Sequence, residues 1–194
     1  MMQSSIKFNA NAYILIGGSS KRFGSHKWEA KLNGVRLIDH TWEICKVFKN
    51  RYIIGKSSFS QIKYPFLMDE IVKVQSPING IYSALSHSKE KWNFIISCDL
   101  PLMSSKMIHK IWTNGNKSTD AIVPVIKGKS NPVCAFYNKK TQSNFKKEIK
   151  NKNLKVLEIL EIINTDYVHI NENQKEFTNM NTQKDLIKII NKSY

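Results

Sequence analysis

The sequence predicts an α/β protein with a mostly parallel central sheet, and three observations support this fold class. Short apolar runs alternate along the chain with stretches of helical periodicity, an order that favours parallel strands joined by helices. Some runs, such as 94–96, are continuously apolar, which is typical of strands that helices cover on both faces. The length of 194 residues suits one core, so we expect residues 1–194 to form a single domain.

The first predicted strand, 13–16, leads through a loop rich in Gly and Ser into a helix with apolar positions from 37 to 48. In sheets of this kind ligands gather at the carboxyl ends of strands, which directs attention to the loop after Ile16 and to Asp99. The other predicted strands are 51–54, 66–68, 94–97 and 121–126, and the other helices are 78–87, 104–113 with Ser104 or Ser105 as N-cap, and about 141–161.

The net charge of +15 favours anionic partners by long-range attraction. The lysines are scattered, and most of their excess falls on the solvated side of the predicted helix 141–161. No homeodomain, zinc-finger or aromatic RNA-binding motif accompanies them, so we expect no nucleic-acid partner, and a non-catalytic nucleic-acid-binding protein is the less favoured alternative from another class. Such a protein would show a steep salt dependence on DNA or RNA and no release of pyrophosphate.

Other features indicate a reducing compartment and no membrane segment. Cys45, Cys98 and Cys134 are widely spaced, without a Cys-x-x-Cys pair or a histidine at zinc-ligand spacing, so we expect reduced, buried thiols. The apolar run 12–16 is too short for a signal core or a membrane span. We therefore expect a soluble, cytoplasmic protein without a membrane partner.

The loop 17–27 combines three glycines, three serines and three cations directly after a strand. Glycines let the backbone approach a ligand and expose N–H groups, while cations neutralise phosphate. The spacing is neither a Walker A loop nor Gly-x-Gly-x-x-Gly, and a solvated surface loop is the alternative interpretation.

Asp99 follows the apolar strand 94–97 and is a candidate magnesium ligand. Mg²⁺ prefers oxygen donors and commonly needs only one or two carboxylates in addition to substrate phosphates. An aspartate of a turn or helix cap before Pro101 is the alternative.

Several motifs resemble the molybdenum cofactor guanylyltransferases. The segment 15–27 is similar to the Gly-Gly, Arg-x-Gly and Lys signature of the wider nucleotidyltransferase family, 76–81 to its Pro-Leu-x-Gly segment, and 98–101 to its metal-binding Cys-Asp-x-Pro. The segment 131–133 is similar to a His-Pro motif, and 177–182 to an Asn-x-Asn-Thr motif of the guanylyltransferases. The matches run in order from Leu15 to Leu186.

The resemblance implies a three-layer, Rossmann-like nucleotidyltransferase fold and transfer of GMP from GTP to molybdopterin with release of pyrophosphate. It also implies Mg²⁺ as cofactor, and molybdopterin-delivering or molybdoenzyme-chaperone proteins as further candidate partners. Related transferases that use CTP with molybdopterin, or that make a nucleotide sugar, stay open as alternatives. The residues implied are Arg22, Lys27 and Asp99 for catalysis, Leu15, Ile16, Gly17, Gly18, Lys27, Asp69 and Asp99 for the nucleotide, Asn179 and Asn181 for molybdopterin, and Asp99 for the metal.

The sequence departs from the family pattern at three positions. His26 stands where the family usually has aspartate, Phe23 where it has methionine, and Gly55 where it often has asparagine. These positions bear on recognition of the base more than on the chemistry, because Arg22, Lys27 and Asp99 are kept.

Overall fold

The computed structural model describes residues 8–17, 26–71, 73–180, 182 and 185. Within these residues the main sheet has eight strands in the order β10-β7-β9-β6-β1-β4-β5, with β8 paired beside β7, and β2 and β3 form a separate hairpin. The strands are β1 (Phe8–Leu15), β2 (Lys31–Leu32), β3 (Val35–Arg36), β4 (Phe48–Gly55), β5 (Phe66–Met68), β6 (Trp92–Ser97), β7 (Ala121–Ile126), β8 (Lys129–Ser130), β9 (Cys134–Asn138) and β10 (Thr165–His169).

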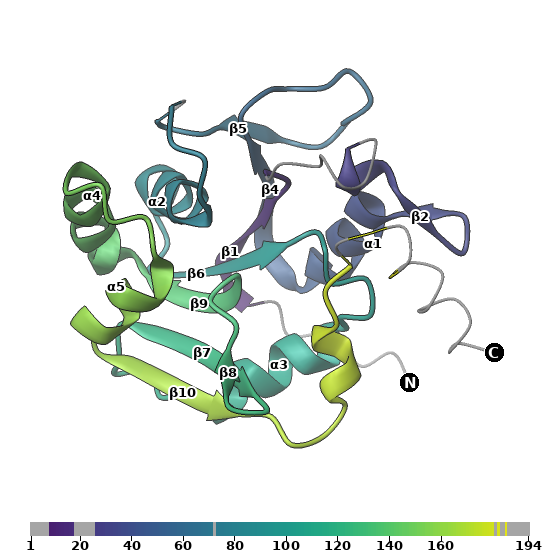
Figure 1. The fold of residues 1–194 in the computed structure, drawn as a ribbon. Helices are drawn as coiled ribbons and strands as arrows, with labels where there is room; N and C mark the ends of the chain where they lie inside the picture. The colour runs from purple at the N-terminus through teal and green to yellow at the C-terminus, as the bar shows by residue number, and fades with distance from the viewer. Residues whose placement is uncertain (1–7, 18–25, 72, 181, 183–184, 186–194) are drawn as a thin grey trace.

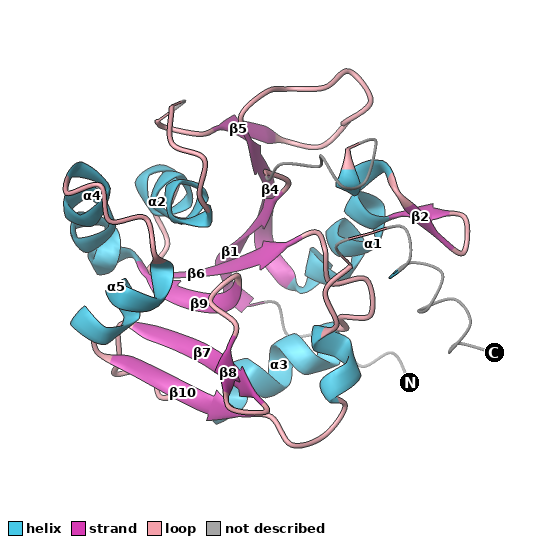
Figure 2. Cartoon of the chain, viewed as in Figure 1, coloured by secondary structure: helices cyan, strands magenta, loops and turns pink. Residues whose placement is uncertain are grey.

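Helices cover both faces of the sheet, as Figures 1 and 2 show. The helices are α1 (Leu37–Ile44), α2 (Pro77–His87), α3 (Ser105–Asn114), α4 (Gln142–Lys150) and α5 (Val156–Ile162). Successive residues of β1 point to opposite faces: Ile14 belongs to the buried cluster shared with α1 and α3, whereas Tyr13 and Leu15 belong to the cluster shared with α2, α4 and α5. The predicted three-layer α/β fold is confirmed.

The sheet is mostly parallel, as predicted. Strands β5, β4, β1 and β6 pair in parallel, and β10 pairs in parallel with β7. Strand β9 is antiparallel to both β6 and β7. Because β9 runs the other way, its amino end lies at the edge where β6 and β7 have their carboxyl ends. The sequence did not predict β9, β10 or the β2-β3 hairpin.

The boundaries of two predicted helices are wrong. Helix α1 ends at Ile44, residues Cys45–Val47 form a 3-10 turn, and Phe48 begins β4 instead of continuing the helix. The ring of Phe48 stacks on Phe8 and Phe94 of neighbouring strands, with ring centroids 4.8 and 5.1 Å apart. Burial against the sheet therefore outweighs the helical periodicity that placed Phe48 in the helix.

The predicted helix 141–161 is also wrong, because it is two helices, α4 and α5, with a turn between them. In that turn Lys152 has a φ of 59°, in the left-handed region, which ends α4. Asn153 Nδ2 donates to Glu148 Oε2 at 2.9 Å and fixes the turn against α4.

Other local predictions are confirmed. Ser104 is the N-cap of α3, and its Oγ accepts from the N–H of Met107 at 3.2 Å. Cys45, Cys98 and Cys134 are buried and free of disulfides. A helix with the length and apolarity for a membrane span does not occur in the described part of the chain.

Candidate active site

The carboxyl ends of β1, β5 and β6 meet at one edge of the sheet and carry the candidate residues. The strand ladder continues past Leu15, because Ile16 N–H donates to Ile54 O at 3.0 Å and Cys98 N–H donates to Leu15 O at 3.2 Å. Asp99 follows Cys98, and Gly17 follows Ile16. The adjacent position of β1 and β6 therefore brings Gly17, at the end of β1, and Asp99 to the same edge, where parallel sheets commonly bind ligands.

Lys27 and Asp99 form an ion pair at this edge, with Lys27 Nζ 3.3 Å from Asp99 Oδ2. Both side chains are partly buried, 24% and 17% exposed respectively. Lys27 begins the 3-10 turn Lys27–Glu29, which buried Trp28 anchors in the core. A cation and a carboxylate are thus held beside each other where the sequence predicted phosphate and metal binding.

The second oxygen of Asp99, Oδ1, is buried and accepts no hydrogen bond from the described residues. A buried carboxylate oxygen without a donor is destabilising unless a ligand satisfies it, so its chemistry fits a magnesium ion. In the described part of the chain no three His, Cys, Asp or Glu side chains cluster to hold a metal by themselves. This finding is consistent with a magnesium ion that is bound by one carboxylate together with the phosphates of the substrate.

Cys98, next to Asp99, does not provide a reactive thiol. Burial raises its pKa to about 12, an effect that the neighbouring Asp99 carboxylate reinforces. The thiol therefore stays protonated at neutral pH. Only the deprotonated thiolate acts as a nucleophile or a metal ligand. Asp99 is the residue of this segment with suitable chemistry.

Asp69 lies at the same edge, directly after β5. Its backbone N–H donates to Gly55 O at 3.0 Å, and its Oδ1 is buried without a hydrogen-bond donor among the described residues. Burial raises the pKa of Asp69, and the nearby Lys56 lowers it in part. Like Asp99, this carboxylate has an oxygen that can accept from a ligand.

Gly55, where the family often has asparagine, lies close to neighbouring side chains. A Cβ there would lie 3.0 Å from Ile16 Cγ1 and 3.3 Å from the Phe66 ring. A side chain at this position would need Ile16 and Phe66 to shift by a few tenths of an ångström. Gly55 itself offers only backbone groups at this edge, whereas Asp69 beside it offers a carboxylate.

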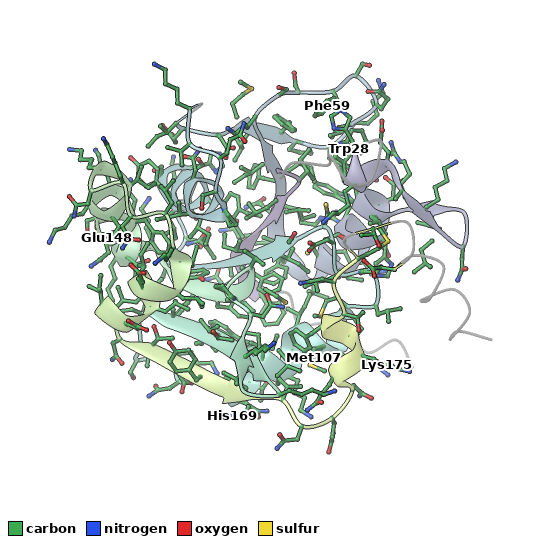
Figure 3. The ribbon with its side chains drawn as sticks, in the orientation of Figure 1. Trp28, Phe59, Met107, Glu148, His169 and Lys175 are labelled. Atoms are coloured by element: carbon green, nitrogen blue, oxygen red, sulfur yellow. The ribbon has the colours of Figure 1, made fainter. Side chains whose placement is uncertain are left out.

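His26, which replaces the family's aspartate, makes aromatic contacts. Its ring lies 5.8 Å from Trp28 and 4.5 Å from Phe59, measured between centroids. Figure 3 shows Trp28 and Phe59 close together beside the hairpin that follows Lys27. Phe59 therefore supports the segment that carries Lys27, a role that no sequence motif indicates.

The carboxy-terminal segment reaches the same site. Met180 N–H donates to Asp99 O at 2.9 Å, and the Met180 side chain is fully buried beside Leu37. Asn179 is exposed next to this anchor. Val133 O accepts from Ser97 N–H at 2.8 Å, so the segment 131–133 also lies beside the end of β6.

Two residues hold the segment after Asp69: Asn79, from the motif segment 76–81, and Ser83, which the sequence did not single out. Asn79 and Ser83, both on α2, hydrogen-bond to the backbone of Glu70 and Ile71. The predicted site residues Gly18, Arg22 and Asn181 lie outside the described residues. Among the others, Lys27 and Asp99 are in contact, and Asn179 lies next to Met180, which is hydrogen-bonded to Asp99. Asp69 lies at the same edge but follows β5, which β4 and β1 separate from β6.

Comparison with known proteins shows the family of this chain. The family model described as the MobA-like NTP transferase domain matches residues 12–161 of the sequence. A protein of Aquifex aeolicus named as a probable molybdenum cofactor guanylyltransferase is 34% identical over 183 residues, which cover 92% of this chain and 89% of that protein. One of the same name from Natranaerobius thermophilus is 29% identical, with 92% and 93% covered.

Solved structures agree with the fold. A crystal structure of an Aquifex aeolicus protein superposes with a TM-score of 0.75 at 33% identity and covers 89% of this chain and 93% of that chain. The molybdopterin-guanine dinucleotide biosynthesis protein A of Archaeoglobus fulgidus superposes with a TM-score of 0.82 at 23% identity, over 94% and 98% of the two chains.

Proposed function

The chain belongs to the MobA-like NTP transferase family, and on that premise we propose that it transfers GMP from GTP to molybdopterin and releases pyrophosphate. The names of its relatives support this choice of substrates. The observation that carries the proposal is the Lys27–Asp99 pair at the end of β6, where Asp99 has a second, buried oxygen that accepts no hydrogen bond from the residues that the structure describes.

The reaction needs alignment of two polyanions more than it needs a base. The attacking phosphate monoester has a second pKa near 6, so it is largely dianionic at neutral pH and loses no proton to attack the α-phosphorus. The site contributes by holding both phosphates in line and by stabilising the charge that develops on the leaving pyrophosphate.

Each part of the site has a role in this proposal. The backbone N–H groups of Gly17 and Gly18 hold the triphosphate, Arg22 neutralises its β- and γ-phosphates, and the Lys27 ammonium lies against the α-phosphate. Asp99 would hold Mg²⁺ through its buried Oδ1. When bound, magnesium supplies Lewis-acid stabilisation of phosphate charge.

The two substrates occupy different segments. Asp69, after β5, together with Leu15 and Ile16 at the end of β1, forms the nucleotide side. Asn179 and Asn181 form the molybdopterin side, and Met180 between them is tied to the Asp99 backbone. Amide side chains both donate and accept hydrogen bonds, which suits the edge of a pterin.

The test is pyrophosphate release with magnesium, molybdopterin and GTP, CTP, ATP or UTP in turn, with the product identified by its mass. We expect release with GTP and a product heavier than molybdopterin by one GMP unit. Turnover with CTP alone would assign the cytidylyl alternative, and turnover only with a sugar phosphate as acceptor would assign nucleotide-sugar synthesis. No release with any nucleotide, together with salt-sensitive binding of DNA or RNA, would overturn the proposal.

A further inference from the structure

We propose that Asn79 and Ser83 of α2 are positioning residues for the nucleotide, acting through the segment that carries Asp69. This inference rests on the proposed function, in which Asp69 contacts GTP. Neither side chain is expected to touch a substrate. Their role is to fix the backbone on which the Asp69 carboxylate is mounted.

The side chain of Asn79 hydrogen-bonds to both backbone polar groups of Ile71. Its Oδ1 accepts from Ile71 N–H at 3.3 Å, and its Nδ2 donates to Ile71 O at 2.8 Å and more weakly to Val74 O at 3.4 Å. The side chain is fully buried. A buried amide that satisfies both polar groups of one residue acts like a short piece of strand ladder.

Ser83 extends this arrangement by one helical turn toward Asp69. Its Oγ accepts from Glu70 N–H at 2.8 Å and donates to Asn79 O, also at 2.8 Å. Glu70 is the immediate neighbour of Asp69, whose own N–H is held by Gly55 O. The backbone is thus fixed on both sides of the Asp69 side chain, once by the sheet and once by α2.

Helix α2 is itself held in register by the end of β1. A Cβ on Gly80 would lie 2.8 Å from Leu15 Cδ2, so this glycine lets the helix press directly on the last residue of β1. Leu15 leads into the glycine-rich loop. One helix therefore sets the end of β1 relative to the segment after β5, through Gly80 on one side and through Asn79 and Ser83 on the other.

The experiment compares two serines of the same helix. Ser83→Ala removes the acceptor for Glu70 N–H, whereas Ser86→Ala, the matched control, removes a contact with Gln142 on α4. GTP affinity is measured by calorimetry without molybdopterin. We expect Ser83→Ala to weaken GTP binding ~5-fold, the effect of one lost hydrogen bond, and Ser86→Ala to leave it unchanged. Asn79→Asp, which sets a carboxylate oxygen against Ile71 O, should weaken it further.

A double-mutant cycle shows whether Ser83 acts through Asp69. If it does, Ser83→Ala has no further effect on GTP affinity once Asp69→Ala is present. In turnover assays the KM for GTP should rise while kcat at saturating GTP and the KM for molybdopterin stay within about twofold. A general loosening of the fold would instead lower kcat and raise both KM values.

The outcomes separate the two proposals. If Ser83→Ala and Asn79→Asp bind GTP normally, and Asp69→Ala weakens GTP binding in these variants as much as it does in the wild type, the positioning role is overturned. The proposed function would still stand. Additive effects in the cycle would also overturn the positioning role. A wild-type protein that binds no GTP would overturn the proposed function itself, and the positioning role with it.

Discussion

The backbone N–H of Met180 donates to the carbonyl oxygen of Asp99 at 2.9 Å, which attaches the carboxy-terminal segment to the end of β6. The buried Met180 side chain fixes this attachment beside Leu37. Met180 therefore holds Asn179 near Asp99. The Asn179 side chain is exposed, so it does not contribute to packing of the core. This arrangement lets binding of molybdopterin be tested separately from stability.

We expect Asn179→Ala to weaken molybdopterin binding ~5- to 10-fold while GTP affinity and Tm stay the same, because it removes hydrogen bonds to one ligand only. Asn181→Ala should behave likewise. Calorimetric titration with each substrate measures both affinities, with Thr178→Ala, an exposed neighbour, as control. A parallel loss of GTP and molybdopterin affinity would mean that the segment supports the fold instead of binding the pterin.

Asp99→Asn should fold and lose most transferase activity, because it removes the charge of the proposed magnesium ligand without changing side-chain volume. A loss of ~100-fold or more is expected, with the deficit largest at low magnesium. Glu161→Gln, an exposed change of the same kind on α5, should have no effect. Pyrophosphate release across a magnesium series measures this, and full activity at limiting magnesium would contradict the assignment.

Lys27→Ala should lower kcat ~100-fold, since one cation placed against the reacting phosphate is worth ~3 kcal/mol in such a site. The control is Lys147→Ala on α4, which removes the same charge from an exposed surface. Arg51 is less suitable, because its guanidinium lies 4.3 Å from the Trp42 ring and donates to Trp42 O at 2.8 Å. Equal, small effects of the two lysine variants would show that only the overall charge matters.

Asp69→Asn should stabilise the protein at neutral pH and weaken GTP binding. Burial raises the folded-state pKa of Asp69 above its ordinary value of 3.8, so the ionised carboxylate costs stability as the pH rises above that value. We expect a Tm gain of a few degrees at pH 7 that disappears below about pH 4, where the group is protonated in both states. Thermal unfolding at the two pH values measures it, and a pH-independent change in Tm would contradict this origin.

The sequence predicted those parts of the fold that local patterns specify. Strands 66–68 and 121–126 have the predicted bounds, because each is a short apolar run with a clear end. Strand β9 escaped prediction, since its position between β6 and β7 depends on pairing with residues distant in the chain. The turn at Lys152 was not predicted, because the apolar positions on both sides of it fit one continuous helix.

The same distinction holds for the site. The resemblance supplied Lys27, Asp69 and Asp99, whose chemistry is visible in their residue type. It gave no sign of Ser83 or Phe59, whose roles arise from contacts with distant backbone and aromatic groups. Residues that support a site through packing have no characteristic spacing, so a single sequence does not reveal them.

The two ways in which the nucleotide segments are held lead to different rates of amide hydrogen exchange. Strand β1 lies between β4 and β6 and is bonded along both edges, so its amides exchange only when the whole sheet opens. The N–H groups of Glu70 and Ile71 each depend on one side chain of α2, and they exchange through a local opening that leaves the sheet intact. We therefore expect the amides of Glu70 and Ile71 to exchange faster than those of β1, a difference that hydrogen-exchange measurements on the protein would show.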